Sequence, residues 1–224
     1  MRLAALSLAL ALGAAATPAM AAGAPGDWQL IGFAEHDTPF NNNEIPLHPA
    51  PGGLALAVVD GTWHLVPATL DTRVPDPTGQ PDSVLLLATP PDALAYLRLP
   101  GLAAGKVDTP DLRFRGVERD ISRKSVAIPF KGTPYRFELQ AGSSWLTNGT
   151  LRQKVLAADP RVTGAEADML TVRLLWAGDL DHDGKLDFII ANWFDDGGTM
   201  CVWLSSRAKA GELAGQAACM EHAV

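Results

Sequence analysis

Basic side chains are in short supply in this sequence: 18 lysines and arginines stand against 25 aspartates and glutamates, for a formal net charge of −7. An acidic surface argues against nucleic acid and anionic membranes as partners, because binding to phosphate requires clustered Lys and Arg. The nearest approach to a basic cluster, residues 113–124, interleaves its arginines with Asp and Glu. A segment of mixed charge is typical of a solvated surface.

Long hydrophobic runs are missing after the first 21 residues, so we expect no membrane span in the mature protein. The N-terminus has the three parts of a signal peptide: Arg2, the apolar run 3–16 and the small-residue cleavage motif Ala19-Met20-Ala21. The alternative is an uncleaved anchor or a buried helix, but the run is short and Thr17-Pro18 interrupts it. Cleavage after Ala21 predicts a periplasmic or secreted protein of about 200 residues, enough for one sizeable core or two small ones.

Helical periodicity is also missing, because no segment sustains a hydrophobic period of 3.6 residues. Instead, three pairs of apolar runs are joined by short dipeptides, namely Asp60-Gly61, Lys131-Gly132 and Asn148-Gly149. Asp-Gly and Asn-Gly favour two-residue type I′ turns, in which both residues have positive φ. Asn148-Gly149-Thr150 also matches a glycosylation acceptor, although the turn already accounts for the Asn and the Gly. The sequence therefore predicts a mainly β protein whose antiparallel hairpins form a sandwich or a partial barrel.

The C-terminal third contains further strand candidates. Residues 170–177 alternate, with Val172, Leu174 and Trp176 on one face, and residues 188–191 are apolar throughout. No linker divides the mature chain, so we predict a signal peptide over residues 1–21 and one β-rich domain over residues 22–224. The alternative is a break in the Pro-rich segment 71–83.

Cysteine is rare, with Cys201 and Cys219 as the only two. In an exported chain such a pair is more often bridged than free, and closing so short a loop would stabilise the fold by about 3 kcal/mol in the chain-entropy model. The alternative is a Cys–His–Asp catalytic arrangement, but neither cysteine lies in a recognisable nucleophile motif.

The strongest chemical signal is the nine-residue segment 179–187. Aspartates occupy its positions 1, 3, 5 and 9, and Gly184 stands at position 6, where a sharp turn is needed. Carboxylates crowded this closely repel one another unless a cation lies between them, and an all-oxygen set suits Ca²⁺. Leu180 and His182 are expected to point away from the ion. The predicted ligands are the side chains of four aspartates and one backbone carbonyl: Asp179, Asp181, Asp183, Asp187 and, through its carbonyl, Lys185. The alternative is an acidic surface turn without an ion.

This segment, from Gly178 to Ile190, resembles the FG-GAP/VCBS class of calcium loops, in which the loop connects two β-strands and an apolar run follows the last Asp. An EF-hand begins with the same pattern, but Ile190 stands where an EF-hand requires a bidentate Glu, and the flanks have the pattern of strands. The resemblance implies a strand–loop–strand calcium site near the C-terminus and no particular activity. The pattern occurs once, whereas a propeller would need several repeats.

A second resemblance covers more of the C-terminal third. Residues 176–181 and 204–206 are similar to a Trp-Ala-Gly-Asp-x-Asp core and a Leu-Ser-Ser strand end found in a group of exported proteobacterial proteins without assigned activity. This similarity implies export and brings no mechanism with it.

The expected function is that of an exported calcium-binding protein, a structural or ligand-binding module in which calcium stabilises the fold. Its ligand is expected to be a carbohydrate or a protein, because exposed tryptophans can stack on sugars, whereas buried ones would only pack the core. The tryptophans available for either role are Trp28, Trp63, Trp145, Trp176, Trp193 and Trp203.

The alternative function is that of a secreted or periplasmic hydrolase whose fold calcium supports. No nucleophile elbow, zincin helix or other catalytic pattern is present. The candidate acids and bases are His36, His48, His64, Asp195 and Asp196, of which His36 is notable for its neighbours Glu35 and Asp37.

Overall fold

The computed structural model describes residues 28–32, 40–41, 44–73, 83–110, 119–120, 125–140, 143–156, 171–194 and 197–223. These residues form strands, with one short 3-10 turn, η1 (Ser205–Arg207), and no α-helix. The strands are β1 (Leu30–Gly32), β2 (Phe40–Asn41), β3 (Leu54–Val59), β4 (Thr62–Pro67), β5 (Thr69–Arg73), β6 (Ser83–Thr89), β7 (Ala95–Leu97), β8 (Gly105–Lys106), β9 (Arg119–Asp120), β10 (Val126–Phe130), β11 (Thr133–Gln140), β12 (Ser143–Thr147), β13 (Arg152–Leu156), β14 (Thr171–Gly178), β15 (Asp187–Phe194), β16 (Gly197–Leu204) and β17 (Gly215–Ala223).

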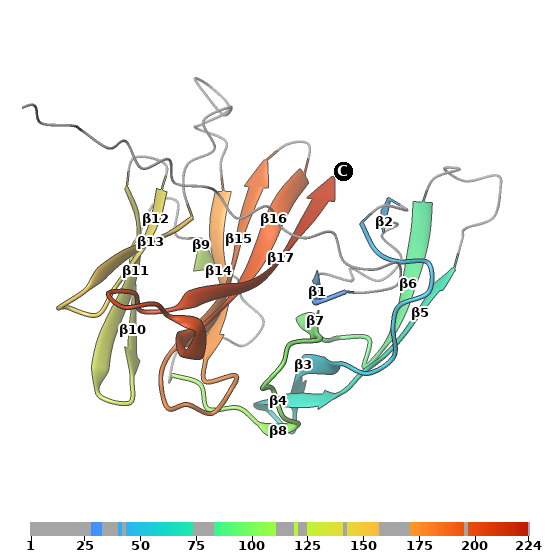
Figure 1. The fold of residues 1–224 in the computed structure, drawn as a ribbon, viewed down its shortest axis with the longest axis horizontal. Coiled ribbons are helices and arrows are strands. Elements are labelled where there is room, and N and C mark those ends of the chain that lie inside the picture. Colours follow the sequence, from blue (N-terminus) through green and yellow to red (C-terminus); the bar gives the residue numbers. More distant parts are fainter. Residues whose placement is uncertain are drawn as a thin grey trace, which may run out of the picture.

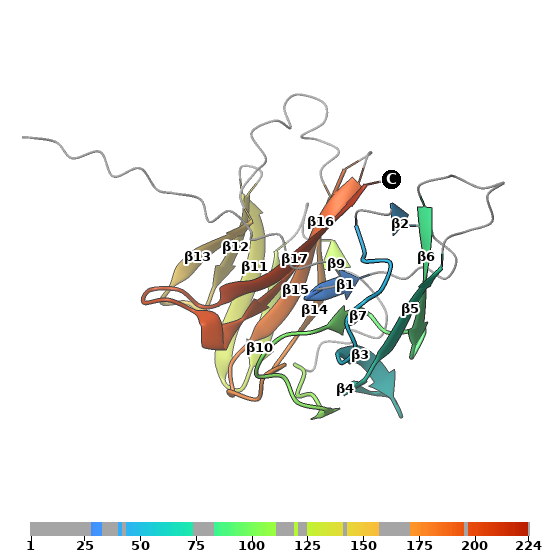
Figure 2. The same ribbon diagram turned by 45° about the vertical axis from the view of Figure 1, so that its right-hand side comes forward.

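The strands pair antiparallel in four sheets, which confirms the predicted fold class. Their orders are β1-β7-β3-β4-β8, β2-β6-β5, β10-β11-β12-β13 and β17-β16-β15-β14-β9. The last of these, here called the central sheet, lies between the β10–β13 sheet on one side and the sheets of the N-terminal half on the other (Figure 1). The turned view in Figure 2 shows the same layering. Of the two predicted arrangements, the described strands form the sandwich, in open sheets packed face to face.

The central sheet is buried on both faces. Along β15 the side chains alternate between two hydrophobic cores: Phe188 and Ile190 pack against the β10–β13 sheet, whereas Ile189 and Ala191 pack against the N-terminal sheets. A strand buried on both faces needs apolar residues at every position, because neither face meets water. This explains the apolar run that the sequence shows over residues 188–191.

Strand β14 departs from the simple alternation predicted for it. Its register against β15 shifts between Leu174 and Trp176, so Leu175 is an extra residue in the ladder. Such a bulge reverses the faces of the residues that follow. Leu174 therefore lies in the core beside the β10–β13 sheet, whereas Leu175 and Trp176 both lie in the core beside the N-terminal sheets.

Two of the three predicted hairpin turns have the expected conformation. In the β3–β4 turn Asp60 and Gly61 have φ of 49° and 76°, and in the β10–β11 turn Lys131 and Gly132 have φ of 44° and 82°. Positive φ at both residues is the geometry that matches the twist of paired strands. Each of these two turns therefore closes its hairpin with two residues.

The third hairpin closes differently. The β12–β13 pairing ends at Thr147 opposite Arg152, so four residues rather than two form the turn. Of the Asn-Gly pair only Gly149 has a positive φ, of 91°, while the Asn148 side chain accepts the backbone N–H groups of Thr150 and Leu151. Asn acts here through its side chain, as in Asx turns, instead of through a left-handed backbone.

The predicted disulfide is present. Cys201 in β16 is bonded to Cys219 in β17, and the two residues stand directly opposite each other in the ladder. Cys201 is buried in the core shared with the β10–β13 sheet. The bond therefore ties the edge strand β17 to its neighbour β16 in the central sheet.

The predicted division of the chain into a signal peptide and one domain stays a prediction, because residues 1–27 lie outside the described part. In the described part no helix is long and apolar enough to cross a membrane.

Candidate metal centre

The acidic segment connects two neighbouring strands of the central sheet. Strand β14 ends at Gly178, strand β15 begins at Asp187, and the residues between them form the loop. At its start Leu180 is buried in the core beside the N-terminal sheets, and at its end Leu186 is buried in the core beside the β10–β13 sheet. The loop is thus a strand–loop–strand unit, unlike an EF-hand, and it is fastened into both cores.

Gly178 sets the entrance to the loop. A Cβ atom at this position would lie 2.5 Å from the backbone carbonyl of Asp108 and 2.5 Å from the ring of Trp176. No side chain fits at that distance, so the glycine allows the backbone of residue 108 to come up against the loop. There Asp108 and Asp179 form an isolated antiparallel bridge, in which the Asp179 N–H donates to the Asp108 carbonyl at 2.9 Å.

Three of the predicted ligands come together. One carboxylate oxygen from each of Asp179, Asp181 and Asp187 lies within 4.8 Å of the others. Asp179 and Asp187 are 1% and 0% exposed, whereas Asp181 is partly exposed. Three carboxylates at this spacing, two of them buried, are a donor set for a hard cation such as Ca²⁺ or Mg²⁺.

Asp187 is almost fully satisfied by the protein itself. Its Oδ1 accepts the backbone N–H of Ser205 at 2.7 Å and the Ser205 hydroxyl at 2.9 Å. Its Oδ2 accepts the backbone N–H of Leu180 at 2.7 Å and that of Asp181 at 3.4 Å. Burial nevertheless outweighs these donors and raises the pKa of Asp187 to about 7. Asp187 therefore joins the first turn of the loop to η1 at the end of β16.

Asp179 is satisfied on one oxygen only. Its Oδ2 accepts the backbone N–H of Gly184 at 3.0 Å and the Lys131 ammonium at 2.7 Å. Its Oδ1 is buried and has no hydrogen-bond partner. A buried carboxylate oxygen without a donor is costly, and an ion bound beside it would remove that cost.

The remaining predicted ligands lie in the exposed tip of the loop. Asp183 is exposed, and its Oδ1 accepts the backbone N–H of Lys185 at 2.8 Å. His182 is also exposed and has a φ of 60°, and Gly184 has a φ of 85°, as the sharp turn requires. The cluster of three carboxylates does not include Asp183. Ligation by the Asp183 side chain and the Lys185 carbonyl stays a prediction.

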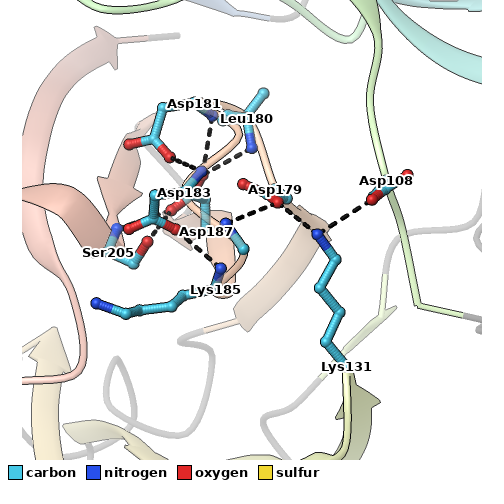
Figure 3. A network of polar contacts seen from close by, with 10 residues as sticks. Asp108, Lys131, Asp179, Leu180, Asp181, Asp183, Lys185, Asp187 and Ser205 are labelled. Atoms are coloured by element: carbon cyan, nitrogen blue, oxygen red, sulfur yellow. Dashed lines mark hydrogen bonds and ion pairs between the residues drawn. The ribbon is translucent and has the colours of Figure 1, made fainter.

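Three residues beside the loop, Lys131, Asp108 and Ser206, were not predicted from the sequence. The Lys131 ammonium, from the β10–β11 turn, lies 2.7 Å from Asp179 and 3.1 Å from the Asp108 carboxylate (Figure 3). The hydrogen bond that Lys131 donates to Asp179 is the main reason that the pKa of Lys131 is raised, so its charge is retained. Ser206 in η1 donates its hydroxyl to Asp181. All three residues are far from the loop in sequence, and the only hint was the Leu-Ser-Ser strand end.

The tryptophans with described side chains are engaged in packing. Trp28, Trp176 and Trp203 are buried. Trp63 packs edge-to-face on Trp176, with ring centroids 6.4 Å apart. Trp145 is partly buried beneath the Arg152 guanidinium, which lies 4.1 Å from its ring centroid.

The candidate catalytic residues do not gather at the loop in the described part of the chain. His48 is exposed in the segment before β3, and His64 in β4 interacts with the neighbouring Thr62 hydroxyl. Neither makes a hydrogen bond or ion pair with the carboxylates of the loop in that part. His36, Asp195 and Asp196 lie outside the described residues.

No family model matches this chain, and no curated protein or solved structure matches it either.

Proposed function

We propose that this protein binds one calcium ion in the loop 179–187, in the manner of the FG-GAP/VCBS loops that it resembles, and that the ion stabilises the fold. The observation that carries the proposal is the unpartnered Oδ1 of Asp179, buried beside two other carboxylates. Ca²⁺ is the preferred ion because it tolerates a variable number of carboxylate and carbonyl ligands in flexible geometry, whereas Mg²⁺ demands octahedral geometry.

The position of the loop supports a structural role for the ion. The loop is anchored in both hydrophobic cores, by Leu180 on one side and Leu186 on the other. An ion bound there would hold together the two ends of the loop and, through Asp187 and Ser205, the end of β16. A ligand that binds only the folded state stabilises it by mass action, by about 2.7 kcal/mol at a concentration of 100 times its Kd.

We further propose that the protein is exported, to the periplasm or outside the cell, and works there as a structural or partner-binding module. The Cys201–Cys219 bond supports this, because disulfides persist in oxidising compartments. The partner is proposed to be a protein or a carbohydrate. A sugar stacking on Trp145 would first have to displace the Arg152 guanidinium from its ring.

Thermal melting with and without a chelator, followed by tryptophan fluorescence, tests the calcium site. Saturating Ca²⁺ should raise the Tm by about 5 to 10 °C, from the mass-action gain and the usual scaling for a chain of this size. Asp183→Ala should abolish this gain, and Asp71→Ala, an exposed aspartate on β5, should leave it unchanged. An identical Tm in calcium and chelator, with no ion detected by mass spectrometry, would refute the proposal.

A further inference from the structure

Lys131 occupies an unusual backbone position. It is the first residue of the two-residue β10–β11 turn and has a φ of 44°. In the equivalent turn between β3 and β4 that place belongs to Asp60, with a φ of 49°. Asp, Asn and Gly tolerate the left-handed region, whereas a long side chain such as Lys is uncommon there. A residue held in a disfavoured conformation points to a role for its side chain.

The side chain of Lys131 connects three parts of the molecule. Its ammonium, from the β10–β11 turn, lies 2.7 Å from Oδ2 of Asp179 in the loop and 3.1 Å from Oδ2 of Asp108, which follows β8. The Asp179 side chain is 2% exposed, whereas the Lys131 and Asp108 side chains are 41% and 60% exposed. The partly exposed side chain of Lys131 thus places a positive charge beside the buried carboxylate of Asp179.

Lys131 reaches Asp179 from the side opposite to the other loop carboxylates. In Figure 3, Lys131 and Asp108 lie on one side of Asp179, and Asp181, Asp183 and Asp187 lie on the other. Lys131 takes Oδ2 together with the N–H of Gly184, which leaves Oδ1 without a partner. An ion in the loop and the Lys131 ammonium would therefore share one carboxylate.

We propose that Lys131 is a built-in counter-cation of the calcium loop, which neutralises Asp179 in the metal-free protein and weakens the binding of the ion. This inference rests on the proposed calcium site. Two cations on one buried carboxylate repel each other, and each makes the other's neutralising effect smaller. Such coupling is reciprocal. If Lys131 stabilises the metal-free protein more than the calcium-bound protein, the binding free energy of the ion is weakened by the same difference.

Lys131→Met tests the proposal, because it removes the charge and keeps an unbranched side chain at the same backbone position. In metal-stripped protein the variant should bind Ca²⁺ about tenfold more tightly than the wild type, within the usual range of coupling between sites. Its Tm should fall more in the metal-free state than in saturating calcium. Both quantities are obtained from calcium titrations and melts followed by tryptophan fluorescence.

Two controls accompany this variant. Lys106→Met removes the same charge from an exposed position on β8, two residues before Asp108, and should change the calcium Kd by less than about twofold, because exposed charges at a distance are screened. Lys131→Arg keeps the charge and should restore a Kd close to that of the wild type.

The outcomes separate this inference from the proposed function. If the wild type binds no calcium, the proposed function fails. If the wild type binds calcium and Lys131→Met binds it equally well or more weakly, the proposed function stands and the counter-cation role is refuted, since Lys131 would then only orient Asp179. A Lys131→Met protein that folds only in calcium would support the role.

A second variant decides the matter if Lys131→Met does not fold in either condition. Asp108→Asn leaves Asp179 as the sole carboxylate partner of the Lys131 ammonium among the described residues. The Asp108 carboxylate then no longer offsets the positive charge of Lys131 beside the loop. Its calcium Kd should rise several-fold. An unchanged or lower Kd would overturn the counter-cation role.

Discussion

The two buried aspartates at the ends of the loop, Asp179 and Asp187, have the same side chain and opposite surroundings. Asp187 receives four hydrogen bonds from the protein, from three backbone N–H groups and one hydroxyl. Asp179 has one oxygen with partners and one with none. The difference indicates two roles. Asp187 closes the loop with or without an ion, whereas Oδ1 of Asp179 gains a partner only when an ion binds.

The largest expected effect is that of Asp187→Ala. It leaves the N–H groups of Leu180 and Ser205 buried without acceptors, at about 1–3 kcal/mol each. The free energy of unfolding should fall by about 4 kcal/mol in chelator and by more in calcium, because Asp187 is also one of the three clustered carboxylates. Urea denaturation in both conditions measures this, with Asp71→Ala as the exposed control. A loss confined to the calcium-bound protein would show that Asp187 acts only as a ligand and does not close the loop.

Asp179→Asn should have the next largest effect, and a different one. The amide keeps the shape of the side chain but removes the charge that attracts the ion and the Lys131 ammonium. The calcium-dependent gain of about 2.7 kcal/mol at 100 times the Kd should disappear. Calorimetric titration of the variant checks this. Retention of wild-type calcium affinity would remove Asp179 from the ligand set.

Gly178→Ala changes the surroundings of Asp179 and leaves those of Asp187 in place. The added methyl group would meet the Asp108 carbonyl and the Trp176 ring, and overpacking of this kind costs about 1–3 kcal/mol. We expect a loss of about 2 kcal/mol in urea denaturation together with weaker calcium binding, because the Asp108–Asp179 bridge is displaced. Gly52→Ala, in the segment before β3 with open space around it, strains a positive φ and should leave the calcium affinity unchanged. A fully stable Gly178→Ala protein would mean that β14 can shift without cost.

The smallest expected effect concerns pH. The pKa of Asp187 rises from 3.8 to about 7 on burial. Between these two pH values the metal-free folded protein keeps the carboxyl proton of Asp187, whereas the unfolded chain has lost it. Its contribution to stability is full below about pH 4 and is lost as the pH rises towards 7. A bound cation favours the ionised carboxylate. The gap in Tm between calcium-loaded and metal-stripped protein should therefore widen between about pH 5.5 and pH 8, and a constant gap would contradict the shift.

Local patterns predicted much of the fold. The apolar run 188–191 marked a strand of the central sheet, and Asp60-Gly61 marked a two-residue turn. The bulge at Leu175 and the four-residue turn after Thr147 were missed, because both depend on the register of the partner strand. Strand pairing is a property of two segments, and a single segment does not encode it.

The candidate site, like the fold, could be predicted from the sequence only where it depends on a single segment. The spacing of the aspartates predicted the cluster, since neighbouring residues of one loop must lie close together. The spacing did not reveal that Asp187 is occupied by Ser205 or that Lys131 and Asp108 adjoin Asp179, because these partners arrive through the tertiary fold. Sequence spacing thus identifies potential ligands, and the packing around them decides which oxygens remain available.

The most direct test of the central claim is the number of calcium ions bound per chain. Metal-stripped protein should take up one Ca²⁺ in a calorimetric titration, and Asp179→Asn should take up none while remaining folded. A structure of the calcium complex should then show the ion against Oδ1 of Asp179, the oxygen that has no protein partner. A wild-type protein that binds no calcium, or one that binds it with Oδ1 of Asp179 still unpartnered, would contradict the account.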